Sequence, residues 1–273
     1  MVKRRHQKNS SNASSAGAAA ANDDEVASNY GFDGWVPGVV ESLERIGSPL
    51  PKLVVFDLDY TLWPLWVDTH VDPPLKRKGN AINRVVDRHG QPLSFFPHVP
   101  HILLYLKRHG VEIAAASRTC APPAARQALN GLFLVDDAEF VPTPADSEDE
   151  TEQETGRKAR KASASVTPRR LIKAISLFDH LEIYPGSKIA HFRELHKESG
   201  IDYEDHLFFD DESRNAEVGT KLGVHFVEVG HQGLDLATFE RGVREWRAKK
   251  LVRAKQRGDV DDDEDVVKES GLV

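Results

Sequence analysis

The chain has 273 residues, of which 36 are basic and 43 acidic, so its formal net charge is −7. This balance argues against a nucleic-acid-binding protein, because such proteins usually carry an excess of positive charge. The single cysteine, Cys120, excludes an intrachain disulfide and is typical of a reducing compartment. No apolar stretch is long enough for a membrane helix, and the N-terminus lacks the apolar core of a secretion signal. We therefore expect a cytoplasmic protein.

Three segments are polar and poor in large apolar side chains. Residues 1–30 are rich in Ser, Ala and Asn, residues 143–170 are first acidic and then basic, and residues 258–273 carry an acidic block. Such segments cannot bury enough apolar surface to fold, so we predict two disordered tails and a flexible charged insertion. The stretch KRRHQK at 3–8 fits either a solvated tail or a nuclear-import signal, which would place the protein in the nucleus as well. The remaining residues, 35–250, suffice for one domain.

Strands and helices are expected to alternate along this domain. The run LVVF at 53–56 is apolar on both faces, as in a strand buried in a parallel sheet. Residues 84–97 predict a hairpin, and VPHILLYLKRHG has helical spacing with Gly110 placed to end the helix. The later elements are expected as the strand VEIAAAS, the helices PPAARQALNGLF and SKIAHFRELHKESG, the strands at HLFFD and VHFVEVG, and a helix at 235–257. This alternation predicts an α/β fold, a Rossmann-like parallel sheet with helices on both faces.

The first expected strand ends in two aspartates. Asp57 and Asp59 follow LVVF, and residues i and i+2 of an extended chain point the same way, so both carboxylates would lie on one side of the strand end. Two like charges at such a distance are costly unless they share a cation or a proton. Taken alone, the stretch is explained as well by acids that cap a strand.

More polar side chains are expected at the same edge of the sheet. In parallel α/β sheets the ligand crevice lies beyond the carboxyl ends of the strands. The additional candidates at strand ends, or in a loop before a helix, are Ser117, Arg118, Lys188, Asp210 and Asp211. Each has an ordinary structural explanation by itself. Their expected meeting at one edge indicates a functional site.

The residue types at this edge favour phosphoryl transfer. Clustered carboxylates without His or Cys ligands favour a hard cation such as Mg²⁺ over zinc. A lysine and a serine hydroxyl suit the remaining oxygens of a phosphoryl group. One aspartate can be the nucleophile of an aspartyl-phosphate, and its neighbour can give a proton to the leaving oxygen. Nearby carboxylates raise the pKa of that acid and a metal lowers it, and the sequence leaves the balance open.

Four motifs resemble the signature motifs of the haloacid dehalogenase superfamily of phosphohydrolases, namely FDLDYTLWP, AASRT, EIYPGSK and FFDDESRN. The longer stretch VVFDLDYTLWPLWVDTHVDPP is similar to the magnesium-dependent phosphatase-1 branch of that superfamily. The resemblance covers residues 50–230, apart from the insertion. It implies a phosphatase that uses Mg²⁺ and an aspartyl-phosphate. Some superfamily members carry a folded cap between the second and third motifs, but the insertion here has no apolar core to build one, so we expect an open site.

The resemblance also implies roles for individual residues. Asp57 would be the nucleophile and Asp59 the general acid and base, with Lys188 as the third catalytic residue. The implied Mg²⁺ ligands are Asp57, the carbonyl of Asp59 and Asp211, with Asp210 adjacent. The implied contacts to phosphate or substrate are Ser117, Lys188, the amide of Leu58, Arg118 and, as a wall for the leaving group, Trp66.

Several residues keep a second explanation. Ordinary core packing accounts for Trp63 and Trp66 as well as a substrate role does. Asn215 stands where many superfamily members have a second acid. It would therefore support the metal ligands without binding the metal itself. Cys120 follows the SRT stretch and could be a redox-sensitive thiol, although an electropositive setting would be required.

The resulting hypothesis is a magnesium-dependent phosphatase for phosphate monoesters. Its substrates would be phosphosugars and other small phosphometabolites, or phosphotyrosine in proteins. A non-catalytic interaction protein that uses this fold and its charged tails is an alternative, although such a protein has no need of both Asp57 and Asp59. A phosphotransferase is another alternative and would need a closed, dry site. We expect a phosphorylated small molecule or phosphoprotein as partner, and neither a membrane nor a nucleic acid.

Overall fold

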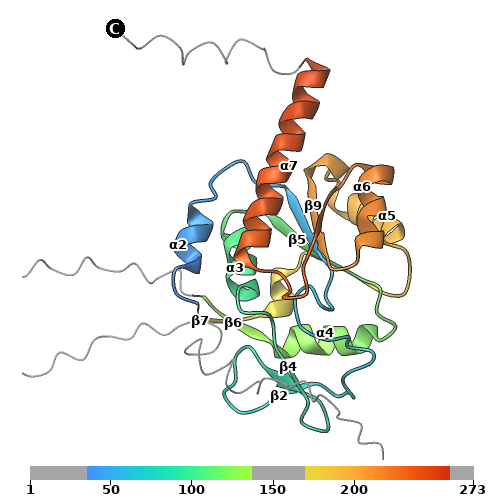
Figure 1. Ribbon diagram of the computed structural model, residues 1–273. Coiled ribbons are helices and arrows are strands. Elements are labelled where there is room, and N and C mark those ends of the chain that lie inside the picture. Colours follow the sequence, from blue (N-terminus) through green and yellow to red (C-terminus); the bar gives the residue numbers. More distant parts are fainter. Residues whose placement is uncertain (1–35, 137–169, 259–273) are drawn as a thin grey trace, which may run out of the picture.

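The computed structural model describes residues 36–136 and 170–258, so the predictions for the tails and the insertion lie almost entirely outside the described residues. Five strands form a central parallel sheet in the order β10-β9-β1-β5-β8. These strands are β1 (Leu53–Phe56), β5 (Glu112–Ser117), β8 (His180–Ile183), β9 (His206–Asp210) and β10 (His225–Glu228). The predicted α/β class and parallel sheet are confirmed (Figure 1).

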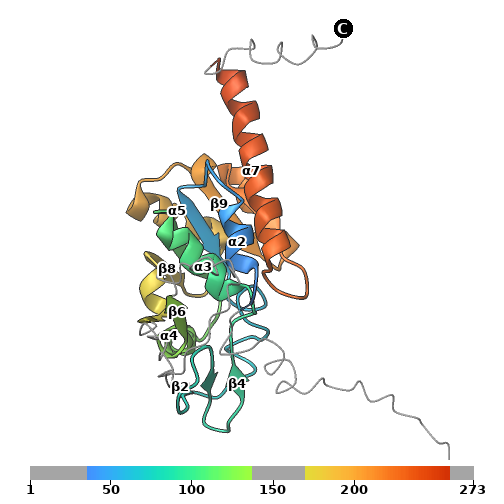
Figure 2. The same cartoon turned by 90° about the vertical axis from the view of Figure 1, so that its left-hand side faces the viewer.

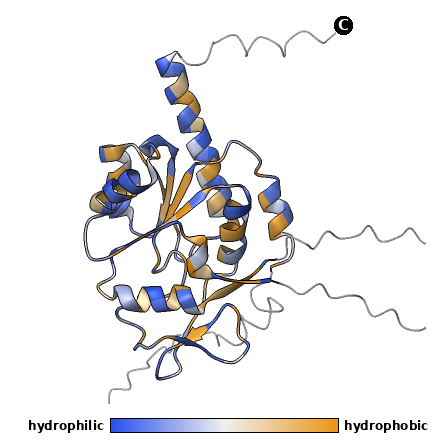
Figure 3. Cartoon of the chain, turned by 180° about the vertical axis from the view of Figure 1, so that it is seen from behind, coloured by the Kyte–Doolittle hydropathy of each residue, from blue (hydrophilic) through white to orange (hydrophobic). Residues whose placement is uncertain are grey.

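Helices cover both faces of this sheet (Figures 1 and 2). They are α2 (Val39–Glu44), α3 (Val99–Arg108), α4 (Pro122–Gly131), α5 (Lys188–Ser199), α6 (Glu217–Leu222) and α7 (Leu236–Arg257). Alternate residues of β1 enter different cores, since Val54 and Phe56 pack with α2, α3 and α7 whereas Leu53 and Val55 pack with α5 and α6. The apolar run of β1 therefore reflects burial on both faces. Figure 3 shows hydrophobic residues concentrated in the central strands.

Short elements complete the described part. The 3₁₀ helices are η2 (Ala174–Leu177), η3 (Tyr203–Asp205) and η4 (Ser213–Ala216). A three-stranded antiparallel sheet contains β2 (Lys76–Arg77), β3 (Val85–Val86) and β4 (Pro92–Leu93), which confirms the predicted hairpin. A second antiparallel pair joins β6 (Phe133–Asp136) to β7 (Arg170–Lys173), with Asp136 opposite Arg170. The described chain thus leaves the domain and re-enters it at neighbouring positions, on either side of residues 137–169.

Helix α7 lies directly on the sheet and then extends beyond it (Figure 1). Asp235 caps the helix by accepting a hydrogen bond from the Thr238 amide, at 2.7 Å. At Gly242 the helix approaches β9 so closely that an added Cβ would lie 2.8 Å from the Phe209 ring. Among the helices of the described residues, none has both the length and the hydrophobicity needed to cross a bilayer.

Candidate active site

The carboxyl ends of three neighbouring strands form the floor of a cleft. Asp57 follows β1, Ser117 ends β5, and Asp211 follows β9, while Lys188 is the first residue of α5. Most predicted site residues line this cleft, namely Asp57, Asp59, Trp66, Ser117, Arg118, Lys188 and Asp211. Four residues that the sequence did not single out line it as well: Asp68, Thr119, Glu212 and Arg214. Asp210 and Leu58 do not line it and are fully buried.

The cleft is small and open to solvent. Its volume is about 190 Å³, below the range of about 300–1,000 Å³ typical of pockets that enclose a small ligand. A group of the size of a phosphoryl group fits inside, and a larger leaving group must extend outward. Trp66 stands at the mouth with 50% of its surface exposed.

Lys188 joins the ends of three strands. Its side chain is only 1% exposed, and its ammonium lies 2.8 Å from Asp57 Oδ1 and 2.9 Å from Asp210 Oδ2. The same ammonium donates to the carbonyl of Ala116 in β5. Burial lowers the pKa of Lys188, but the carboxylates of Asp57 and Asp210 outweigh it, so that pKa is raised. Lys188 is therefore a fixed positive charge beside Asp57.

Asp210 has no free oxygen. Oδ1 accepts hydrogen bonds from the Glu212 amide (2.8 Å) and from Asn215 Nδ2 (2.9 Å), and Oδ2 accepts from Asn215 Nδ2 (2.9 Å) as well as from Lys188. The residue is 0% exposed. Asp210 thus holds Lys188 in place, and Asn215 holds Asp210 from behind, as its sequence position implied.

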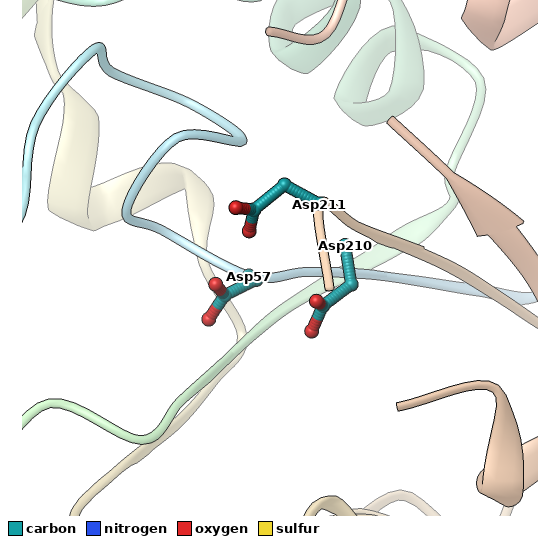
Figure 4. A group of neighbouring side chains, drawn as sticks. All are labelled: Asp57, Asp210 and Asp211. Atoms are coloured by element: carbon teal, nitrogen blue, oxygen red, sulfur yellow. The ribbon is translucent and has the colours of Figure 1, made fainter. Parts of the chain in front are cut away.

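Asp57 and Asp211 keep oxygens that a cation could use. Oxygens of Asp57, Asp210 and Asp211 lie within 4.8 Å of one another, and Figure 4 shows the three carboxylates gathered where β1 and β9 end. Asp57 Oδ2 and both oxygens of Asp211 have no hydrogen-bond partner among the described side chains. Mg²⁺ binds oxygens at about 2.1 Å, which puts opposite ligands about 4.2 Å apart. The donor set and its span therefore suit Mg²⁺ after a small closure.

Burial and nearby carboxylates raise the pKa values of Asp57 and Asp211. Burial raises the pKa of Asp57 to about 8, against the Lys188 ammonium, which lowers it. Burial, with the neighbouring Asp210 carboxylate, raises the pKa of Asp211 to about 6. A cation bound between Asp57 and Asp211 would offset this repulsion.

Asp59 is oriented by the loop that follows it. Its Oδ1 accepts a hydrogen bond from the Trp63 indole at 2.7 Å and from the Val67 amide at 3.3 Å, which leaves Oδ2 toward the cleft. Burial raises the pKa of Asp59 to about 7, although both hydrogen bonds lower it. Such a carboxyl can both give and take a proton near neutral pH. Trp63 is 0% exposed, so it combines core packing with a contact to Asp59.

A tight turn after Asp59 places the backbone of the loop. The carbonyl of Leu58 accepts the Leu62 amide at 2.8 Å, and Tyr60 adopts a positive φ of 54°. The Leu58 amide has no acceptor in the described part of the chain, so it can serve a ligand oxygen as expected. Tyr60 then packs edge-on against Trp66, with ring centroids 5.2 Å apart, and Trp66 stacks on His70 at 5.4 Å.

Asp68 forms the rim beside residues 119 and 120. It accepts hydrogen bonds from the Cys120 amide (3.3 Å) and the Cys120 thiol (3.1 Å). These contacts raise the pKa of the Cys120 thiol, with the hydrogen bond to Asp68 as the largest cause. Cys120 therefore lacks the electropositive setting that a redox-sensitive thiol would require.

Sequence comparisons agree with this geometry. The profile of the family described as Acid Phosphatase matches residues 49–249. A HAD-like (haloacid dehalogenase-like) hydrolase superfamily protein of Schizosaccharomyces pombe is 40% identical over 190 residues, 69% of this chain and 92% of that protein. Magnesium-dependent phosphatase 1 of Homo sapiens is 39% identical over 194 residues, 71% of this chain and 86% of that protein.

The chain belongs to the acid phosphatase family that includes magnesium-dependent phosphatase 1. It is thus a phosphatase, and the predicted superfamily is confirmed. The predicted cofactor, Mg²⁺, is confirmed at the level of the family by the names of its relatives. Among solved structures, a phosphatase-domain fragment of a Bacteroides fragilis protein complexed with Mg covers 77% of this chain and 42% of that chain, at 13% identity and a TM-score of 0.37.

Family motifs explain why some cleft residues were predicted and others were not. Asp57, Ser117 and Lys188 stand in three of the four motifs that resemble the haloacid dehalogenase signatures. Asp68 lies in a loop and Arg214 in the short helix η4, and their positions on the rim depend on how these segments fold. Glu212 and Arg214 do lie within the motif FFDDESRN. Its alternating charges were the only sequence feature that could have identified them as cleft residues.

Proposed function

We propose that this chain hydrolyses phosphate monoesters through an aspartyl-phosphate on Asp57 and depends on Mg²⁺. The observation that supports it best is the position of Asp57, whose Oδ1 is paired with Lys188 at 2.8 Å while Oδ2 is free in an open cleft. A carboxylate held in this way is both oriented and accessible. One supporting relative is named a HAD-like hydrolase superfamily protein, and another is named magnesium-dependent phosphatase 1.

Asp57 and Asp211 would hold the Mg²⁺ ion, together with the carbonyl of Asp59 as the family resemblance implies. When bound, the ion supplies positive charge to the phosphate oxygens and offsets the crowded carboxylates. Asp210 would stay with Lys188 and Asn215, because its oxygens already accept their hydrogen bonds.

The protein side chains divide the reaction into two steps. In the first, a carboxylate oxygen of Asp57 forms a bond to phosphorus while the bond from phosphorus to the leaving oxygen breaks, and Asp59 gives its proton to that oxygen. In the second, Asp59 takes a proton from water, the water oxygen bonds to phosphorus, and the bond to Asp57 breaks to release phosphate. Lys188, Ser117 and the Leu58 amide would hold the phosphoryl oxygens throughout.

The open cleft supports substrates whose leaving group projects into solvent. Phosphosugars and other small phosphometabolites satisfy this requirement, and so does phosphotyrosine on a protein surface. Trp66 would form a wall for the leaving group, since half of its surface is exposed at the cleft mouth. Water reaches such a site freely, which favours hydrolysis over a phosphotransferase reaction, and the intact Asp57 and Asp59 argue against a purely binding protein.

Hydrolysis of p-nitrophenyl phosphate tests the mechanism. With Mg²⁺ the wild-type enzyme should be active, and EDTA should abolish that activity. Asp57→Asn keeps the size of the side chain but removes its charge, so activity should fall by at least about three orders of magnitude. The control Asp202→Asn changes an exposed aspartate outside the cleft and should keep full activity. An inactive wild type would favour the binding protein, and an active Asp57→Asn variant would require a different nucleophile.

A further inference from the structure

Two arginines on one side of the cleft mouth have more positive charge than the neighbouring carboxylate can neutralise. Arg118 follows β5 and Arg214 lies in η4, and both line the cleft. Between them stands a single acid, Glu212. One carboxylate therefore serves two guanidinium groups, which leaves one positive charge in excess at this part of the rim.

Glu212 is committed mainly to Arg214. Its two oxygens accept from Arg214 Nε at 2.9 Å and Arg214 Nη2 at 2.5 Å, and Oε2 also accepts from Asn215 at 3.2 Å. Arg118 reaches Glu212 only at 3.5 Å through Nη1. Within the described part of the chain, Arg118 has no other charged partner or hydrogen bond. Most N–H donors of Arg118, and Nη1 of Arg214, therefore have no acceptor among the described residues, and both side chains line the cleft.

The part of the rim formed by Asp68, beside residues 119 and 120, has the reverse character. Asp68 is ionised there, because hydrogen bonds from Cys120 and Thr69 hold the pKa of its carboxyl below the usual range against the effect of burial. Trp66, stacked on His70, adds a flat apolar face next to it. A substrate with an anionic leaving group would therefore turn the anion away from Asp68 and toward the arginines.

The cations of the cleft form two separate groups. Five carboxylates and three cations line it, a formal charge of −2, and a bound Mg²⁺ would bring this to zero. Asp210 and Asp211 also act on Arg214, but Lys188 and the metal would offset them. The phosphoryl group and a further anion would then meet separate cations, Lys188 with Mg²⁺ in the floor and the arginines at the mouth.

We propose that this phosphatase prefers phosphate monoesters that carry a second anionic group on the leaving group, and that Arg118 and Arg214 bind this group. A carboxylate or a second phosphate fits, because guanidinium groups bind both through paired hydrogen bonds. The inference rests on the proposed phosphatase function but adds a binding site for the substrate's distal end. The anion can belong to a small acidic phosphate or to an acidic residue next to phosphotyrosine.

Matched substrate pairs test the proposal. Wild type is assayed with phenyl phosphate and with its 2-, 3- and 4-carboxy derivatives, and kcat/KM should be at least about tenfold higher for one of the carboxylated esters. Arg118→Gln and Arg214→Gln should each reduce that ratio several-fold, and the double variant should bring it to about one. Arg193→Gln, at an exposed arginine of α5 outside the cleft, is the matched control and should keep the wild-type ratio.

A second pair identifies the source of the anion. Two phosphotyrosine peptides differ only in Glu or Gln next to the phosphotyrosine. A preference for the Glu peptide that depends on Arg118 and Arg214 would point to phosphoproteins, and a preference confined to the aryl esters would point to small acidic phosphates. Equal rates within both pairs would overturn the proposal while leaving the phosphatase intact, whereas absence of phenyl phosphate hydrolysis would mean that the proposed function itself fails.

Discussion

Trp63 is the residue that positions Asp59, because its indole donates at 2.7 Å to the oxygen that faces away from the cleft. We expect Trp63→Phe to free the carboxyl and to reduce kcat about tenfold, since a hydrogen bond to a charged group contributes roughly 1.5–3 kcal/mol. This hydrogen bond lowers the pKa of Asp59, so its loss raises that pKa. The limb of the pH profile on which kcat falls with rising pH should therefore move upward.

Phe95→Leu is the matched control for this variant. Phe95 stacks on Trp63, with ring centroids 6.0 Å apart, but does not contact Asp59. The substitution should disturb the packing of Trp63 and leave the pH limb unchanged. An identical pH profile for wild type and Trp63→Phe would contradict a positioning role.

Asp210 and Asp211 are adjacent in the chain but should respond differently to substitution. In Asp211→Asn, the Mg²⁺ concentration that gives half-maximal activity should rise at least about tenfold, because a metal ligand loses its charge. In Asp210→Asn, that concentration should change far less, while stability falls by about 3 kcal/mol because Lys188 loses a buried partner. Mg²⁺ titrations and urea unfolding of both variants separate the two effects, and equal Mg²⁺ requirements would refute the assignment.

For single residues, the sequence predicts which residue types meet at the site. It does not predict which of their oxygens lack a hydrogen-bond donor. The four motifs predict Asp57, Ser117, Lys188 and the aspartate pair at one edge of the sheet. The choice between Asp210 and Asp211 depends on which oxygens already accept hydrogen bonds from Asn215 and Lys188. That information exists only once β9, η4 and α5 are packed together.

The contact between α7 and β9 links the long helix to the active site. A glycine in a helix normally destabilises it by about 1 kcal/mol relative to alanine. At a helix position with free space around it, a Gly→Ala substitution would therefore increase stability. In Gly242→Ala the new methyl group would lie 2.8 Å from the Phe209 ring and 3.1 Å from Val227. We therefore expect the reverse, a loss of about 1–3 kcal/mol in urea unfolding, and reduced activity because Phe209 precedes Asp210. An increase in stability would show that the helix can shift without cost.

The elements that were predicted correctly are those with a pattern of their own. β1, β5 and β9 are continuous apolar runs, and α3 and α5 have helical spacing closed by a glycine. The elements that were missed are short, namely α2, β2, β6 and β7. The strand β7, with the sequence RLIK, is largely exposed and forms by pairing with β6. Its own residues show no pattern that would predict this partner.

Two buried histidines should make the stability of the whole molecule depend on pH. His191 and His206 are both 0% exposed and donate from Nε2 to the carbonyls of Tyr184 and Ile201, at 3.0 and 2.9 Å. Burial lowers the pKa of each to about 4, against about 6.5 in the unfolded chain. Between these values the unfolded chain binds protons that the folded chain does not, so stability falls as pH is lowered from 6.5 toward 4.

The full effect is up to about 3 kcal/mol for each histidine. Asp57, Asp59 and Asp211 affect the acid dependence of both proteins alike. Between pH 7.5 and 4.5, the stability of His206→Gln in urea unfolding should therefore rise relative to that of wild type. His231→Gln, at an exposed histidine, should keep the wild-type dependence. A parallel decline in wild type and His206→Gln would show that other groups control the acid side.

Because Asp136 pairs with Arg170, the number of residues between them does not determine where the active-site residues lie. The described chain on either side of residues 137–169 is joined by the pairing of β6 with β7, so the two ends of this connection lie next to each other. A connection that returns to its starting point can grow or shrink at little cost, because doubling its length adds only about 0.6 kcal/mol of closure free energy. The end of the β6–β7 pair is thus an insertion point. One segment can be exchanged for another there, in evolution or by engineering, without moving Ser117 relative to Lys188.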